Sequence, residues 1–217
     1  VAVDLADVVD ATAPSVVEVF TETKQVSRMF REYVTEGAGS GVILTENGYL
    51  VTNNHVVEGA STIRVRLSNG QAYPAVLAGT DAKTDLAVLK IEASGLPAAK
   101  LADSAKVRAG DFVIAIGNPL GELGGTVTEG IISAKDRQVT IDGQSMTLLQ
   151  TSAAVNPGNS GGGLFNLNGE LVGVVNSKTS GSDIEGLAFA IPANTVKTIV
   201  QQLIQNGYVA GRPQLGV

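Results

Sequence analysis

Four short turn signals divide this chain into runs of residues that favour β-strands. The signals are Asn47-Gly48, Asn69-Gly70, Asp142-Gly143 and Asn168-Gly169. Asn or Asp followed by Gly readily adopts the positive φ angles that two-residue hairpin turns require. The runs between the turns, such as 62–67, alternate apolar and polar side chains as half-buried strands do. The sequence therefore predicts an antiparallel all-β fold of short strands, either a barrel or a sandwich.

The composition is that of a globular protein with a sizeable core. The chain has 217 residues, of which 44% are hydrophobic and 17% are charged. The net charge of −6, with no run of like charges, argues against a nucleic-acid partner. One histidine and no cysteine leave only carboxylates as further metal ligands, so neither a metal nor a cofactor is predicted. No apolar run approaches the roughly 18 residues of a transmembrane helix.

A serine framed by glycines lies in the segment Asn156-Pro157-Gly158-Asn159-Ser160-Gly161-Gly162. Glycines permit positive φ angles and a close approach of the backbone to a ligand. Such a loop can point N–H groups at a developing oxyanion beside the serine hydroxyl. Taken alone, the segment is equally typical of a flexible turn. If the chain supplies a base, Ser160 becomes a candidate nucleophile, with Gly158, Asn159 and Ser160 as oxyanion donors.

The only histidine, His55, lies just past the end of the apolar run 49–51. Imidazole is the side chain best suited to accept and return a proton near neutral pH. A lone histidine is more often a structural residue than a catalyst. Its place at a strand end, in a chain with a glycine-framed serine, favours the role of general base.

The acid of a catalytic triad orients the imidazole and stabilises its charged form. Asp85 is the candidate because it directly precedes the apolar strand predicted over 86–91, where its carboxylate would be partly buried. Asp81 is the local competitor, but it lies in a polar turn and is interpreted as a cap of that turn. Considered without His55 and Ser160, Asp85 would also be interpreted as a turn cap.

The chain order His55, Asp85, Ser160 is that of the chymotrypsin-like barrels. An α/β-hydrolase places its serine first, at a strand-to-helix turn with the spacing Gly-x-Ser-x-Gly, whereas no helical pattern follows Ser160. The order therefore disfavours an esterase-like hydrolase and predicts a serine endopeptidase. The alternative that stays open is a non-catalytic peptide-binding or chaperone module on the same barrel.

Three segments carry the candidate residues, namely 52–57, 84–90 and 156–162. Together they resemble the HtrA branch (DegP-, DegQ- and DegS-like) of the trypsin-like serine proteases. Shorter matches lie at 39–43, 115–119, 130–134 and 188–192, so the resemblance runs from about Ala11 to Gly207. Ser152 departs from the family, which usually has Asp at this place in a Thr-Asp-Ala-Ala segment. The local hydrogen bonding there is expected to differ.

The resemblance implies one trypsin-like protease domain over 1–217, built from two six-stranded antiparallel β-barrel lobes at about 11–103 and 104–192. A C-terminal helix is expected at about 193–206. An apolar stripe at helical spacing independently predicts this helix, with Asn206-Gly207 as its stop; the stripe comprises Val196, Ile199, Val200, Leu203 and Ile204. The helix is expected to pack against the lobes, and residues 5–9 are expected to form a shorter helix.

The resemblance also implies properties of a complete protein. These are unfolded or misfolded protein substrates, a homotrimer, an extracytoplasmic location, and a PDZ domain after a linker at 208–217. The glycine-rich loops 117–125 and 176–186 are expected to switch between ordered and disordered states. Because residues 1–4 lack a basic segment and the chain starts without methionine, we expect no signal peptide here and interpret the chain as a fragment or a processed form.

Small or apolar residues on three segments are expected to shape the substrate pocket. They are Ile131, Ser133, Ala153, Val155, Asn156, Leu187, Ala188 and Phe189. No aspartate has an obvious place at the pocket base to bind Lys or Arg, although Asp183 and Glu185 lie in a nearby loop. The sequence therefore predicts a preference for small or medium aliphatic residues at the cleaved position.

Overall fold

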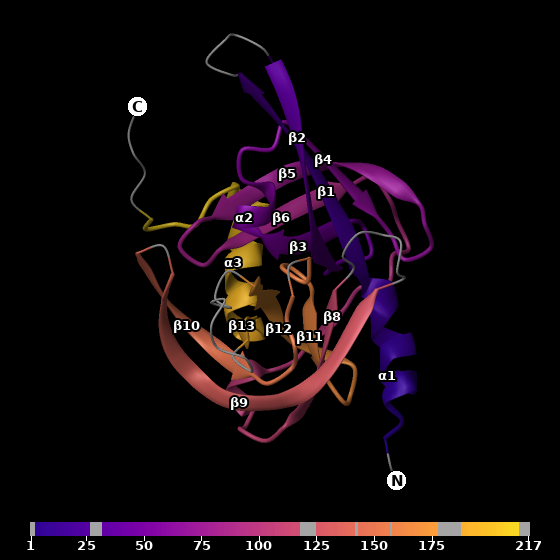
Figure 1. Ribbon diagram of the computed structural model, residues 1–217, viewed down its shortest axis with the longest axis vertical. Helices are drawn as coiled ribbons and strands as arrows, with labels where there is room; N and C mark the ends of the chain where they lie inside the picture. Colours follow the sequence, from indigo (N-terminus) through magenta and orange to yellow (C-terminus); the bar gives the residue numbers. More distant parts are fainter. Residues whose placement is uncertain are drawn as a thin grey trace.

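Two β-sheet lobes make up most of the protein, with a helix running behind both of them (Figure 1). The computed structural model describes residues 3–26, 32–117, 125–141, 143–156, 158–177 and 188–212. The helical segments are α1 (Leu5–Thr12), η1 (Ala13–Ser15), α2 (Asn54–Val57), η2 (Ser104–Lys106) and α3 (Ala193–Asn206). The strands of the first lobe are β1 (Val16–Val26), β2 (Glu32–Ile43), β3 (Tyr49–Asn53), β4 (Thr62–Arg66), β5 (Ala72–Asp81) and β6 (Leu86–Ile91). Those of the second are β7 (Lys100–Leu101), β8 (Phe112–Gly117), β9 (Thr126–Ile141), β10 (Gln144–Thr151), β11 (Gly163–Asn166), β12 (Glu170–Asn176) and β13 (Ala188–Pro192).

The first lobe is a closed antiparallel barrel with the strand order β1-β2-β3-β6-β5-β4. It closes because β1 pairs with β2 along one edge and with β4 along the other. Two of the predicted turns join neighbouring strands here: Asn47-Gly48 lies between β2 and β3, and Asn69-Gly70 lies between β4 and β5. Both glycines have positive φ angles, as the turn signals required.

The second lobe is a seven-stranded sheet with the order β11-β8-β9-β10-β13-β12-β7. An additional pairing of β11 with β12 joins six of these strands into a ring, as predicted. The seventh strand, β7, pairs parallel with β12. Residues 100–101, which the sequence placed in the first lobe, thus belong to the second sheet. The turn Asn168-Gly169 joins β11 to β12; the turn at 142–143 lies between β9 and β10, with Asp142 outside the described residues.

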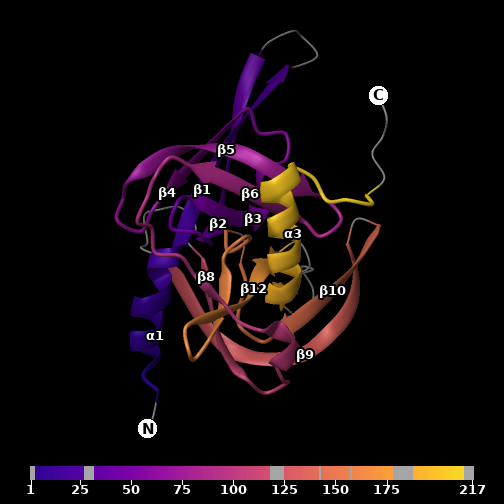
Figure 2. The same ribbon diagram turned by 180° about the vertical axis from the view of Figure 1, so that it is seen from behind.

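Helix α3 packs against both lobes, in contact with β5 and β6 of the barrel and with β12 and β13 of the second sheet (Figure 2). Four members of the predicted apolar stripe, from Val196 to Leu203, are buried, and Ile204 packs beside them. Complete burial of one such side chain stabilises the fold by about 2 kcal/mol. The helix ends at Asn206 and is capped by Gly207, whose φ of 77° is left-handed and whose N–H donates to the Leu203 carbonyl. The predicted N-terminal helix is also present, and it extends to Thr12.

A fully buried carboxylate lies on the barrel strand β1. Glu18 stands opposite Arg66 of β4, whose Nε and Nη2 lie 3.0 and 2.9 Å from Glu18 Oε2. The other carboxylate oxygen, Oε1, is buried and has no hydrogen-bond partner among the described residues. Burial raises the pKa of Glu18 above its ordinary value, and the hydrogen bond and charge of Arg66 oppose this rise only in part.

Replacing Glu18 by Gln is expected to remove one contribution to the pH dependence of stability, namely a loss of stability as the pH rises. Because the folded-state pKa lies above 4.5, the folded protein binds this proton more tightly than the unfolded chain does. The contribution of Glu18 to stability is therefore greatest below that value and falls as the pH rises through the folded pKa. Urea unfolding from about pH 4 to about pH 7 should show the wild type losing stability relative to Glu18→Gln. If the wild type instead gained stability relative to the variant over this pH range, the ion pair with Arg66 would lower the pKa of Glu18 more than burial raises it.

Candidate active site

The two lobes meet where the backbone around Ser160 touches strand β2. The Ser40 N–H donates to the Ser160 carbonyl at 2.8 Å, and Ser40 Oγ donates to the Gly158 carbonyl at 2.6 Å. Thr52 Oγ1 in turn donates to the Ser40 carbonyl at 2.7 Å. Gly161 has a φ of 84°, and a Cβ atom there would lie 2.1 Å from the Ser40 carbonyl oxygen. Only glycine therefore allows this approach of the two backbones.

The barrel supplies the histidine and the aspartate. Strand β3 ends at Asn53, and the single turn α2 then carries His55, as expected for a residue just past a strand end. Asp85 precedes β6 with a left-handed φ of 55°. Its carbonyl accepts hydrogen bonds from Asn54 N–H at 3.0 Å and from Asn53 Nδ2 at 3.1 Å. These bonds hold an otherwise unfavourable backbone conformation that directs the carboxylate at His55.

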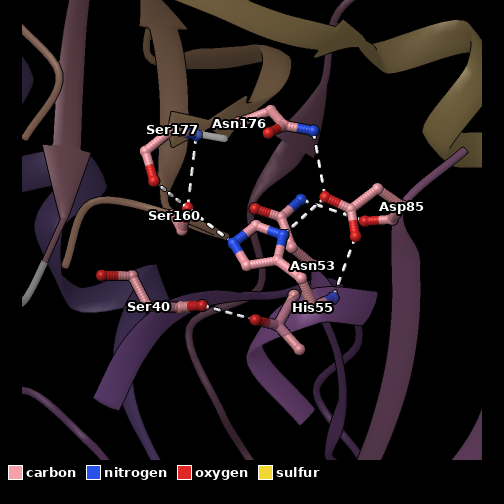
Figure 3. Close-up of polar contacts among 8 residues, drawn as sticks. Ser40, Asn53, His55, Asp85, Ser160, Asn176 and Ser177 are labelled. Atoms are coloured by element: carbon pink, nitrogen blue, oxygen red, sulfur yellow. Dashed lines mark hydrogen bonds and ion pairs between the residues drawn. The ribbon is translucent and has the colours of Figure 1, made fainter. Parts of the chain in front are cut away.

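His55 bridges Asp85 and Ser160 (Figure 3). Its backbone N–H donates to Asp85 Oδ1 at 2.9 Å, and its Nδ1 lies 2.6 Å from Asp85 Oδ2. Its Nε2 lies 3.0 Å from Ser160 Oγ. A carboxylate can only accept, so Nδ1 carries the proton and Nε2 of the neutral ring is the acceptor. The structure thus brings together the three residues that the sequence singled out.

Asp81, the competitor of Asp85, has other partners. Thr84 Oγ1 donates to its Oδ2 at 2.7 Å within the turn, in agreement with the interpretation as a turn residue. Arg212, beyond the end of α3, forms two further hydrogen bonds with Asp81, of 3.0 and 2.8 Å. Asp81 therefore ties the C-terminal segment to the turn that precedes Asp85.

Two residues at the end of β12 join the site, and sequence reasoning missed both. Asn176 Nδ2 donates to Asp85 Oδ2 at 3.0 Å, so the second lobe also holds the aspartate. Ser177 N–H donates to Ser160 Oγ at 3.2 Å, and the two serine Oγ atoms are themselves hydrogen-bonded. The one sequence signal for Asn176 is its place, as a polar amide directly after the apolar run 171–175.

The backbone donors near Ser160 are arranged differently from the prediction in one respect. The Asn159 N–H donates to the Asn156 carbonyl at 3.0 Å, so it is not available as the predicted third oxyanion donor. The N–H groups of Gly158 and Ser160 have no acceptor among the residues that the structure describes. The Asn159 side chain is buried against Gly117, and neither of its amide atoms has a partner within the part of the chain that the structure describes.

The described residues expected to shape the pocket come from strands β9 and β13 and from the segment that follows β10. Ile131 lies beside 151–152: its carbonyl accepts from Thr151 Oγ1 at 2.8 Å, and its N–H donates to Ser152 Oγ at 3.0 Å. At Ser152, which departs from the family's usual Asp, the side-chain hydroxyl accepts this hydrogen bond. Phe189 pairs with Gln150 of β10. Ala153 and Ala188 are buried, Ser133 lies on β9, and Val155 packs beside the core of the second lobe. Leu187, Asp183 and Glu185 fall outside the described residues.

Among the described residues, no group of three or more His, Asp or Glu side chains is placed to hold a metal ion. No helix within the described ranges is long and apolar enough to cross a bilayer.

Comparison with known proteins agrees with the fold. The model of the trypsin-like peptidase domain family matches residues 39–174. The chain is 44% identical over 230 residues to the serine protease Do-like HtrA of Bacillus subtilis, a match that covers 98% of this chain and 51% of that protein. It is 49% identical over 181 residues to a probable periplasmic DegP-like serine endoprotease of Marinomonas, covering 82% of this chain and 38% of the relative. The chain thus spans about half or less of the length of these curated relatives.

Solved structures show the same likeness. The HtrA-type protease AlgW with a tripeptide superimposes with a TM-score of 0.83 at 42% identity, covering 95% of this chain and 65% of that one. A serine endoprotease from Yersinia pestis gives a TM-score of 0.80 at 41% identity, covering 96% and 70%.

The matched domain and the closed barrel define the class of this protein, a trypsin-like peptidase. Within that class the chain belongs to the HtrA family of serine proteases, so the resemblance seen in the sequence is confirmed.

Replacing Gly161 by Ala is expected to destabilise the protein by about 3 kcal/mol or more, because the new Cβ atom meets a backbone oxygen and the φ angle is left-handed. Gly59 is the matched control, since its φ is 71° but nothing lies within 4 Å of a Cβ atom there. Gly59→Ala should destabilise the protein only through the cost of the left-handed backbone conformation, about 1 to 2 kcal/mol. Urea unfolding measures both; equal losses would contradict the close contact between the lobes.

Proposed function

We propose that this chain is the protease domain of an HtrA-type serine endopeptidase that hydrolyses peptide bonds of unfolded or misfolded proteins. The observation that carries the proposal is the continuous hydrogen-bonded series from Asp85 through His55 to Ser160. The names of the relatives, serine protease and serine endoprotease, support the same reaction class.

In the proposed mechanism, Ser160 Oγ attacks the carbonyl carbon of the scissile bond. The Oγ–C bond forms while His55 Nε2 takes the serine proton, and Asp85 holds the ring and stabilises its charged form. His55 then gives the proton to the leaving amine as the C–N bond breaks. Water, deprotonated by the same imidazole, hydrolyses the acyl-enzyme and restores Ser160.

The proposed oxyanion donors are the N–H groups of Gly158 and Ser160. Each donor aimed at the tetrahedral oxygen lowers the barrier by about 3 kcal/mol. Their lack of an acceptor among the described residues supports this assignment. Ser40 holds the same loop in place, because its hydroxyl donates to the Gly158 carbonyl.

Replacing Ser160 by Ala is expected to abolish cleavage of casein while leaving casein binding intact, because the nucleophile is lost and the surface is otherwise unchanged. Gel analysis of casein and a binding assay measure the two effects. Ser145→Ala, an exposed serine on β10, is the matched control and should cleave normally. If Ser160→Ala cleaved as fast as the wild type, the assignment would be wrong. If the wild type bound casein but never cleaved it, the non-catalytic peptide-binding alternative would be favoured.

The proposed pocket comprises Ile131, Ser133, Ala153, Val155, Asn156, Leu187, Ala188 and Phe189. Its small and apolar lining should favour small or medium aliphatic residues at the cleaved position, as the sequence suggested. A peptide panel that varies only this position measures the preference through kcat/KM. A tenfold or greater preference for Arg or Lys would refute the proposed lining.

The proposal extends to the complete protein, which we infer acts outside the cytoplasm as a homotrimer with a PDZ domain after the linker at 208–217. The name of the Marinomonas relative, a probable periplasmic serine endoprotease, supports the location. The trimer and the PDZ domain follow from the family resemblance. The domain division at about 11–103, 104–192 and 193–206 is supported by the two sheets and by α3, except that residues 100–101 belong to the second sheet.

A further inference from the structure

We propose that Ser177 is a positioning residue that caps the nucleophile, so that its hydroxyl must move away before Ser160 can attack. This inference rests on the proposed function, since it concerns the same nucleophile. It starts from the contacts at the end of β12, where both the N–H and the hydroxyl of Ser177 reach Ser160 Oγ. Figure 3 shows Ser177 and His55 approaching this atom from different directions.

The direction of each hydrogen bond follows from the partners along the series. Asp85 can only accept, so His55 Nδ1 donates to it and the neutral ring offers Nε2 as an acceptor. Ser160 must then give its single proton to His55 Nε2. The hydrogen bond between the two serine hydroxyls therefore has Ser177 as the donor.

Both acceptor positions of Ser160 Oγ are occupied as a result. A hydroxyl oxygen has two lone pairs, and here one accepts from Ser177 N–H and the other from the Ser177 hydroxyl. Attack on a carbonyl requires one lone pair to form the new Oγ–C bond. The serine proton is thus directed at His55, the base. Both lone pairs of Ser160 Oγ, however, are held in hydrogen bonds from Ser177, and one of them is needed to form the new bond.

The position of Ser177 makes such a cap separable from the rest of the site. Asn176, the preceding residue, holds Asp85 through its side chain. Ser177 itself is only half-buried. A rotation of the Ser177 side chain alone would release one lone pair, leaving the bonds from Asn176 to Asp85 and from Asp85 to His55 in place.

The experiment measures the reactivity of Ser160 toward a small alkyl fluorophosphonate, which needs no peptide-binding surface. In this reaction Ser160 Oγ bonds to phosphorus, the P–F bond breaks, fluoride leaves and His55 takes the proton. Ser177→Ala should raise the second-order rate of labelling about 2- to 10-fold, the effect of removing one ordinary hydrogen bond. Ser177→Thr keeps the hydroxyl and should be labelled at close to the wild-type rate. If only the volume of the Ser177 side chain mattered, the larger Thr side chain would not be expected to keep this rate.

Controls separate this inference from the proposed function. Ser145→Ala should label like the wild type, Ser160→Ala should not label, and mass spectrometry should place the adduct on Ser160. Equal or slower labelling of Ser177→Ala on Ser160 would overturn the cap and leave the proposed nucleophile intact. No labelling of the wild type would overturn the proposed function and the cap with it. If Ser177→Ala proves unstable on melting, Ser177→Gly removes the same hydroxyl and must show the same acceleration.

Discussion

The site depends on one backbone contact between the lobes, the hydrogen bond from Ser40 N–H to the Ser160 carbonyl. Ser160 belongs to the second lobe, whereas His55 and Asp85 belong to the barrel, so this contact sets the distance between base and nucleophile. It exists because Gly161 has no side chain to meet the Ser40 carbonyl. The helix α3, buried against both sheets, and the Ser40 hydroxyl on Gly158 stabilise the same arrangement.

Asp85 is the second point at which both lobes act on one residue. From the barrel, Asn53 and Asn54 hold its carbonyl and His55 engages both of its carboxylate oxygens. From the second lobe, Asn176 donates to Oδ2. A buried carboxylate with this many donors is fixed in orientation, as the partner of a catalytic imidazole must be. The same strand end brings Ser177 to the nucleophile, so orientation of the acid and capping of the serine arise from adjacent residues.

Much of the fold and the central residues of the site could be predicted, because each had a local signal. The Asn-Gly turns, the stripe on α3 and the place of His55 at a strand end depend on neighbours in sequence, and the structure agrees with all three. The oxyanion donors were predicted less well. The Asn159 N–H donates within its own turn, to the carbonyl of Asn156 three residues before it. Asn176 and Ser177 could not be assigned, because nothing near them in sequence indicates that β12 ends beside Asp85 and Ser160.

The sequence by itself determined the class of fold, the identity of the three central residues and their order along the chain. These are properties of local backbone preference and of side-chain chemistry, and a scarce residue such as the single histidine leaves few alternatives. Only the tertiary structure decided that Asn176 holds the acid, that Arg212 ties Asp81, and that Ser177 donates to the nucleophile. Those contacts join residues between 17 and 131 positions apart, and hydrogen bonding over such separations depends on how the sheets pack rather than on any local pattern.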